Sequence, residues 1–302
     1  MRHTPVLLSE VLEYLRPTPG MHVIDCTLGD AGHSEALLQK IVPHGKLLGI
    51  DADPEALLRA KNYLHSFASD VTFVRDNFSE LQKIVDQEKF TPVHTVLIDL
   101  GWSSPQFEER GRGFSFLKDE KLDMRYGGSG SHARTAADIV NSESEERLGK
   151  IFWEYGEEKL SKEIAAAVVA ARGSKEIQTT GELVEMILNT YRTKLKTDKE
   201  IPWVGGLHPA TKVFQALRIA VNEELDVIRA VLPQAVDVLE SGGRLAVISF
   251  HSLEDRIVKH YFKSIDGKSI KILTKKPVTA AEQEAEENPR ARSAKLRVIE
   301  KL

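Results

Sequence analysis

Three aspartates stand at the ends of short apolar runs, where their carboxylates could share one binding crevice. They are Asp25, Asp51 and Asp99, and each run is long enough for a buried strand. In a doubly wound sheet the carboxyl ends of the strands meet at one edge, and ligands bind there. A carboxylate such as Asp51 at that edge can accept hydrogen bonds from both hydroxyls of a ribose. The pattern therefore predicts a nucleoside site.

The turn after Asp25 carries two glycines, Gly29 and Gly32. Glycine lets the backbone pass close to a ligand. The G-x-x-G spacing is not a dinucleotide fingerprint, which would need a glycine at Ala31, so a pyrophosphate is disfavoured. A ligand with one nucleoside and no phosphate is favoured, and S-adenosylmethionine fits that description. The alternative is an ordinary α/β protein in which Asp25 and Asp51 only cap helices.

Asp99 and His251 are candidates for chemistry at the same sheet edge, because each lies where an apolar run ends. An exocyclic amine is a poor nucleophile, since its lone pair is delocalised into the ring. An acceptor such as Asp99, or a neighbouring backbone carbonyl, can hold the N–H groups and turn the nitrogen toward a methyl donor. His251 can bond the substrate or orient Asp99. The alternatives are an N-cap role for Asp99 and a loop-stabilising role for His251.

Aromatic side chains lie near arginines in the segment that follows. Trp102, Phe114 and Phe116 are candidates for stacking on a base, with Arg112 beside them. Stacking on an unpaired base is worth roughly 1–3 kcal/mol. The alternative is core filling or interdomain packing. The histidines are scattered without partners at ligand spacing, so we expect no metal site.

The composition limits the protein class. The chain has 302 residues, 41% of them hydrophobic, which can supply a full core. Its one cysteine, Cys26, excludes an intramolecular disulfide, and the N-terminus carries no secretory pattern. We therefore expect a soluble cytoplasmic protein. A formal net charge of −4 means that any contact with nucleic acid must be local.

Apolar runs alternate with helical patterns in two stretches of the chain, and this alternation predicts a parallel sheet with helices on both faces. Strands are expected at residues 22–26, 46–51, 71–74, 94–100, 244–250, 269–274 and 295–300. Helices are expected at residues 32–42, 54–66, 79–88, 136–141, 144–155, 157–172, 179–190, 210–221 and 222–240. The polar, acidic stretch at residues 278–287 is expected to be a loop or a short helix.

No strand pattern is found from about residue 106 to residue 208. The simplest account is a doubly wound, Rossmann-like α/β domain interrupted by a helical insertion, since two separate domains would leave the first sheet without its closing half. The expected division is residues 1–108 for the first part, 109–208 for the insertion and 209–302 for the second part.

Several segments together resemble the ribosomal RNA small subunit methyltransferase H family, also called the MraW family. They cover nearly the whole chain in family order. The matching stretches are residues 3–8 (HTPVLL), 25–34 (DCTLGDAGHS), 99–106 (DLGWSSPQ), 110–116 (RGRGFSF), 122–125 (LDMR), 155–158 (YGEE), 208–211 (HPAT), 214–219 (FQALRI), 242–256 and 288–293 (NPRARS).

The resemblance implies an enzyme that uses S-adenosylmethionine to methylate N4 of a cytidine in 16S rRNA at the decoding centre, in the P site. It implies that the helical insertion engages the substrate. Trp102, Arg112 and Phe114 are our candidates for contacts with the substrate. Whether the protein forms a homodimer is left open. The positions that the resemblance implies for cofactor binding are Ala31, Gly32, His33, Asp51, Phe78, Asp99 and Gln106.

Two positions depart from the family pattern. The family usually has glycine at the position of Ala31, where a positive φ would strain an alanine. It usually has a small aliphatic residue at the position of Trp102, so local substrate contacts are expected to differ.

Two rival functions stay open. A DNA or protein amine methyltransferase would share the same cofactor pocket and would place methyl label in DNA or protein. A non-catalytic RNA-binding or assembly factor on the same scaffold would bind no S-adenosylmethionine.

Overall fold

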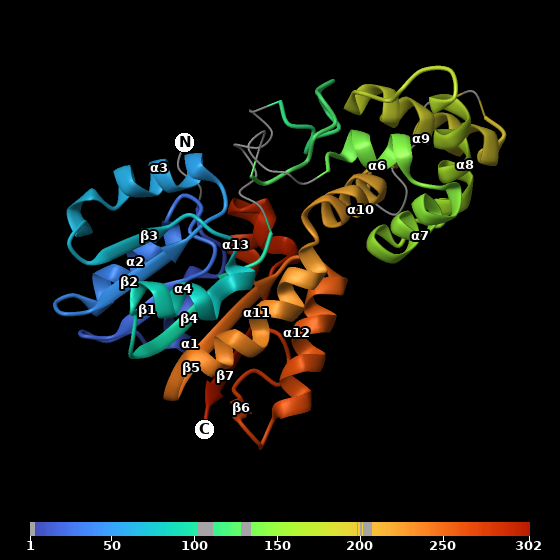
Figure 1. Ribbon diagram of the computed structural model, residues 1–302. Coiled ribbons are helices and arrows are strands. Elements are labelled where there is room, and N and C mark those ends of the chain that lie inside the picture. The colour runs from blue at the N-terminus through green and yellow to red at the C-terminus, as the bar shows by residue number, and fades with distance from the viewer. Residues whose placement is uncertain (1–3, 102–110, 128–133, 198, 200, 202–206) are drawn as a thin grey trace. The chain divides into compact units, whose positions relative to one another are not determined.

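The computed structural model describes residues 4–101, 111–127, 134–197, 199, 201 and 207–302. The chain forms two compact units (Figure 1). One, which we call the sheet unit, consists of Met1–Ser103 and Leu225–Leu302. The other, the helical unit, consists of Ser104–Glu224.

The sheet unit is built on seven strands in the order β3-β2-β1-β4-β5-β7-β6. Strands β1 to β5 are parallel to one another, and β7 pairs antiparallel with both β5 and β6. The chain runs outward from β1 in one direction through β2 and β3, and then resumes beside β1 with β4. The bounds are β1 His22–Asp25, β2 Lys46–Ile50, β3 Val71–Val74, β4 Val93–Asp99, β5 Leu239–Ser249, β6 Ile270–Ile272 and β7 Lys295–Lys301.

Helices cover both faces of this sheet (Figure 1). On one face α1, α2 and α3 bury apolar side chains against alternate residues of β1, β2, β4, β5 and β7. On the other face lie α4, α11 and α12, as the βαβ connections of a doubly wound sheet require. The bounds are α1 Leu8–Leu15, α2 Gly32–Ile41, α3 Pro54–Tyr63, α4 Leu81–Glu88, α11 Glu224–Val238, α12 Ser252–Ile265 and α13 Glu282–Glu287, with 3-10 turns η1 His65–Phe67, η2 Phe78–Glu80 and η4 Pro289–Ser293.

The helical unit packs α10 on α7, α7 on α8 and α8 on α9. Two of its helices begin with a capping box, in which Thr135 pairs with Asp138 and Thr179 pairs with Glu182. These boxes satisfy backbone N–H groups that would otherwise lack partners at the helix starts. The bounds are α6 Ala136–Ser142, α7 Glu145–Gly156, α8 Ser161–Arg172, α9 Thr180–Leu195 and α10 Thr211–Asn222.

The expected α/β class with a doubly wound sheet and inserted helices is confirmed. All seven expected strands are present, and β5 begins five residues earlier than expected, at Leu239. Helices α1 and α12 were not expected. The end of the helical unit also differs from the expected residue 208. Helix α10 packs on α6 and α7, so the helical unit extends to Glu224.

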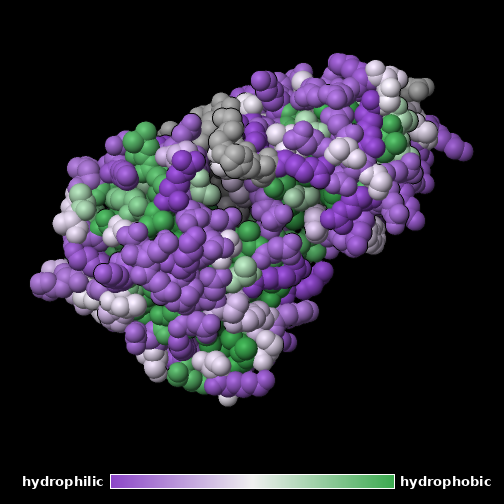
Figure 2. Space-filling view, viewed as in Figure 1, coloured by the Kyte–Doolittle hydropathy of each residue, from purple (hydrophilic) through white to green (hydrophobic). Residues whose placement is uncertain are grey.

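The molecular face shown in Figure 2 is mainly hydrophilic, with hydrophobic residues in scattered groups. Among the described residues, no helix is both long and apolar enough to cross a membrane.

Candidate functional site

The three aspartates singled out from the sequence lie on neighbouring strands at one edge of the sheet. Asp25 ends β1, Asp99 ends β4, and Asp51 directly follows β2. Strand β1 lies between β2 and β4, and the chain changes its direction of travel across the sheet at this point. A doubly wound sheet binds ligands at such a switch point, outside the carboxyl ends of its strands.

Asp51 holds the turn that faces this edge. Its Oδ2 accepts the N–H of Gly29 at 2.9 Å, and its Oδ1 accepts the N–H of Asp53 at 2.8 Å. Helix α3 is capped by Asp53, whose side chain accepts the N–H of Glu55, so Asp51 is not the cap. Each carboxylate oxygen has a further lone pair for a ribose hydroxyl. Burial raises the pKa of Asp51 to about 6.

Asp25 is a positioning group below the surface. It is 2% exposed, and its Oδ2 accepts the hydroxyl of Ser34 at 2.6 Å, while its Oδ1 accepts the N–H of Thr27 at 3.0 Å. The hydroxyl oxygen of Thr27 in turn accepts the backbone N–H of Asp99 at 2.8 Å. Burial raises the pKa of Asp25. The residue before α2 is Ala31, so Asp25 does not cap that helix either.

The glycine-bearing turn adopts left-handed backbone at two residues, Gly29 (φ 50°) and Ala31 (φ 57°). The positive φ that the family's glycine permits is therefore present here in an alanine. A left-handed conformation costs an L residue roughly 1–2 kcal/mol. The methyl group of Ala31 is fully buried in the core, which offsets part of this cost. A β-carbon on Gly32 would lie 3.0 Å from Pro5, so the N-terminal segment runs close to this turn.

His33 connects the N-terminal segment to Asp99. Its Nε2 lies 2.9 Å from the carbonyl oxygen of Val6, and its Nδ1 lies 3.7 Å from Oδ2 of Asp99. Among the described residues, the buried Oδ1 of Asp99 has no hydrogen-bond partner. Burial raises the pKa of Asp99 to about 6. The expectation that Asp99 could cap the next segment lies outside the described residues, because that segment begins at residue 102.

The structure says less about two further expected cofactor positions, Phe78 and Gln106. Phe78 opens the 3-10 turn after β3 and is half-buried. Gln106 and Trp102 lie outside the described residues.

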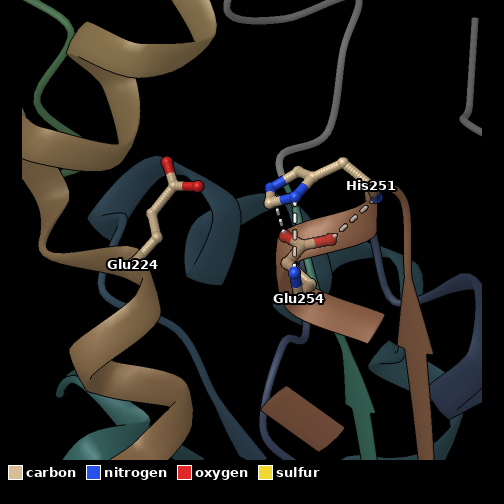
Figure 3. Close-up of side chains that lie close together, drawn as sticks. All are labelled: Glu224, His251 and Glu254. Carbon is tan, nitrogen blue, oxygen red and sulfur yellow. Dashed lines mark hydrogen bonds and ion pairs between the residues drawn. The ribbon is translucent and has the colours of Figure 1, made fainter. Parts of the chain in front are cut away.

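His251 is the N-cap of α12 (Figure 3). Its Nδ1 accepts the N–H of Glu254 at 3.4 Å, and the buried carboxylate of Glu254 accepts the N–H groups of Phe250 and His251 at 2.7 and 3.2 Å. Nε2 of His251 lies 3.3 Å from the same carboxylate. These contacts are the ones expected of a loop-stabilising histidine.

Arg112 and Phe114 belong to the helical unit, where both take part in its internal packing. Arg112 donates to the carbonyl oxygens of Arg125 and Tyr126 at 3.3 and 3.2 Å. Phe114 is 7% exposed and its ring stacks on that of Tyr126, with centroids 5.8 Å apart. This environment matches the packing alternative, because a base could reach the Phe114 ring only if its neighbours moved.

Sequence reasoning did not find several side chains that support the site. Thr27 joins Asp25 to the backbone of Asp99, and Ser34 donates to Asp25. Arg59 of α3 pairs with Asp30 of the turn at 2.9 Å. Arg290 lies over the ring of Phe250, 5.6 Å from its centroid. Thr27 and Ser34 belong to the polar 25–34 segment, and that pattern could have indicated them. The sequence around Arg59 and Arg290 does not indicate which residues they contact.

Comparison with known proteins shows that the sequence matches one family over its whole length. The sequence model of the MraW methylase family matches residues 1–302. The chain is 44% identical to the ribosomal RNA small subunit methyltransferase H of Heliobacterium mobile, over 99% of both chains. It is 45% identical to the protein of that name in Dictyoglomus thermophilum, over 99% of this chain and 96% of the relative. It is 42% identical to the protein of that name in Brevibacillus brevis, over 99% of this chain and 98% of the relative. The chain belongs to the MraW methylase family.

Proposed function

We propose that this protein methylates the exocyclic N4 amine of a cytidine in 16S rRNA, in the part of the small ribosomal subunit that forms the P site. The methyl donor is S-adenosylmethionine. The partner is 16S rRNA in the small subunit or its precursor, and we place the reaction in the cytoplasm, where ribosomal subunits assemble. The relatives that span nearly the full chain carry the name of a small-subunit rRNA methyltransferase, which supports rRNA as the substrate.

The observation that carries the proposal is the arrangement of Asp51 and Asp99. Asp51 has free lone pairs on both oxygens, and Asp99 has a buried oxygen with no hydrogen-bond partner among the described residues. A buried carboxylate oxygen without a partner is costly unless a ligand supplies a donor. A ribose offers two hydroxyl donors and an exocyclic amine offers N–H donors, so these two groups fit what the aspartates lack.

In this proposal the cofactor is held by the turn and by Asp51. Asp51 accepts the ribose hydroxyls, the backbone of Ala31, Gly32 and His33 lies against the nucleoside, and Phe78 flanks the adenine. When bound, the cofactor supplies an electrophilic methyl group on a sulfonium. The chain's own residues contribute position and charge, and Gln106 is the further residue expected at this site.

Asp99 orients the amine. An ionised Asp99 accepts N–H bonds from the target nitrogen and so directs its lone pair toward the methyl group. The methylated nitrogen is an acidic cation that loses its extra proton readily, so no base has to act before transfer. Catalysis then comes mainly from positioning, in which a displacement of about 1 Å can cost on the order of 100-fold in rate.

The helical unit contributes the RNA-binding surface in this proposal, with Arg112 and Phe114 as candidates for substrate contacts. Trp102, which lies just before this unit in the sequence, is the third candidate. The helices of this unit carry exposed lysines and arginines, of which several are already paired with glutamates, such as Lys194 with Glu163 at 2.8 Å. Binding therefore depends on local groups rather than on an overall positive field.

The test is methyl transfer from labelled S-adenosylmethionine to purified small ribosomal subunits, followed by nucleoside analysis of the RNA. We expect labelled N4-methylated cytidine with the unmodified protein and at least a 100-fold slower single-turnover rate with Asp99→Asn. The control variant is Asp70→Asn, because Asp70 pairs with Lys46 before the amino end of β3.

Three results would contradict the proposal. Label in DNA or protein in place of RNA would favour the other amine methyltransferases. Binding of small subunits without any affinity for S-adenosylmethionine would favour an assembly factor. Full recovery of the Asp99→Asn rate at saturating cofactor would make Asp99 a cofactor ligand only.

A further inference from the structure

His33 uses both ring nitrogens, and one of them has a fixed role. Nε2 lies 2.9 Å from the carbonyl oxygen of Val6, and a carbonyl oxygen can only accept, so Nε2 carries a hydrogen. Nδ1 is then the nitrogen whose protonation can change, and it faces Oδ2 of Asp99 at 3.7 Å. The side chain is 7% exposed, so water competes little for either contact.

This arrangement restricts the protonation states of the two residues. With a proton on Nδ1, an imidazolium faces a carboxylate and the two attract each other. With Nδ1 bare and Asp99 ionised, a lone pair faces a negative charge. With Nδ1 bare and Asp99 protonated, the carboxyl group is neutral and no longer a strong acceptor. Of these arrangements, only the ion pair keeps Asp99 both ionised and attracted to its neighbour.

The surroundings of the pair contain charges of both signs. Asp25 of β1 and Glu254 of α12 disfavour ionisation of Asp99, and burial does so most strongly, while His33 and then Arg290 of η4 favour it. His33 is the largest of the groups that oppose the effect of burial. Asp25 also interacts with His33 itself.

We propose that His33 is a positioning residue, which keeps Asp99 ionised and aimed at the substrate while the carbonyl group of Val6 fixes its ring. The inference rests on the function proposed above, in which Asp99 accepts the N–H groups of the target amine. A protonated Asp99 would present a donor toward those N–H groups and would release the amine. The N-terminal segment, through Val6, thereby becomes part of the active edge.

Two substitutions separate the two contacts of His33. In His33→Gln the amide nitrogen can still donate to the carbonyl of Val6, but no cation faces Asp99. In His33→Asn a shorter amide can reach toward Asp99, but the contact with Val6 is lost. His260, an exposed residue of α12, provides the matched control His260→Gln.

The first measurement uses the free protein and needs no methyl transfer. The carboxyl carbon of Asp99 is followed by NMR during a pH titration and is assigned by its loss in Asp99→Asn. We expect His33→Gln to raise the apparent pKa of Asp99 by about one unit, since removing an opposite charge at this distance has an effect of that size. We expect no shift in His260→Gln. An unchanged titration of Asp99 in folded His33→Gln would overturn the inference.

The unmodified protein gives a second reading that does not depend on any variant folding. Because the two side chains face each other at 3.7 Å, a change in the charge of the imidazole should appear as a second, smaller inflection in the Asp99 signal. A titration of Asp99 without that inflection would also overturn the inference.

The second measurement is the pH dependence of single-turnover methylation. We expect the acid limb of the rate profile to move up by about one pH unit in His33→Gln, so that the loss of rate is larger at low pH than at high pH. A purely structural role would lower the rate equally at every pH and would contradict the inference. If the unmodified protein transfers no methyl group to rRNA, the proposed function fails, and the carboxyl titration still decides the role of His33.

Discussion

Asp51 shows how one residue can serve both the fold and a ligand. It accepts two backbone N–H groups, from Gly29 and Asp53, and these bonds hold the turn beside β2. The lone pairs that remain are available to a ligand. Burial raises the pKa of Asp51 to about 6, so the ionised carboxylate lowers the stability of the free protein. Hydrogen bonds from the cofactor hydroxyls would offset part of this destabilisation.

We expect Asp51→Asn to weaken S-adenosylmethionine binding by at least tenfold. The substitution removes the charge and one acceptor oxygen, and a hydrogen bond to a charged group contributes about 1.5–3 kcal/mol. Calorimetric titration measures the dissociation constant, and Asp70→Asn is the control. A folded Asp51→Asn protein with an unchanged dissociation constant would remove Asp51 from the cofactor site.

The pH dependence of binding should follow the raised pKa of Asp51. Below about pH 6 the carboxyl group becomes neutral and accepts more weakly, so affinity for S-adenosylmethionine should fall as the pH drops from 7 to 5. Stability of the free protein changes in the opposite sense, because the cost of burying the ionised group disappears as it takes up a proton. Calorimetry at several pH values tests this, and constant affinity from pH 8 to pH 5 would contradict it.

At the scale of elements, the sequence predicted the parallel sheet well because its strands are continuous apolar runs ended by polar residues. Helix α12 was not predicted, although its buried residues Glu254, Val258 and Phe262 recur at helical spacing; it begins with a histidine cap in place of the usual Ser, Thr, Asp or Asn. Helix α1 was not predicted either; it is eight residues long and lacks a side-chain cap. The division at residue 208 was drawn from strand patterning alone, which does not reveal that α10 packs on α7.

The candidate site was predictable in part for the same reason. Strand ends and glycine-bearing turns are visible in the sequence, so Asp51 and Asp99 could be placed at one edge. The hydrogen bonds from Ser34 through Asp25 and Thr27 to Asp99 depend on how three segments fold together. No local pattern specifies such contacts.

The capping role of His251 gives a prediction for α12. We expect His251→Ala to lower the free energy of unfolding by about 1 kcal/mol, whereas His251→Asn keeps a capping acceptor and most of the stability. Urea denaturation measures both. The methylation rate of His251→Asn should stay within about twofold of the unmodified protein. A stable His251→Asn protein with a rate reduced tenfold or more would show that the imidazole takes part in the reaction.

At the scale of the whole molecule, the two compact units suggest a division of labour. The aspartates and the turn all belong to the sheet unit, while α6 to α10 form the helical unit with its own core. We expect a protein in which residues 109–224 are replaced by a short linker, so that Gln106 is kept, to bind S-adenosylmethionine and to lose rRNA methylation. Circular dichroism checks that the sheet unit folds, and methylation retained by a folded deletion protein would contradict the division.

We propose above that this protein places a methyl group on N4 of one cytidine in 16S rRNA. The most direct measurement is mass mapping of 16S rRNA from cells with and without the gene, and from cells in which Asp99→Asn replaces the natural residue. We predict that one N4-methyl mark, at a P-site cytidine, is absent without the gene, returns with the unmodified protein and does not return with Asp99→Asn. A 16S rRNA whose methyl marks are identical in all of these cells would contradict the account.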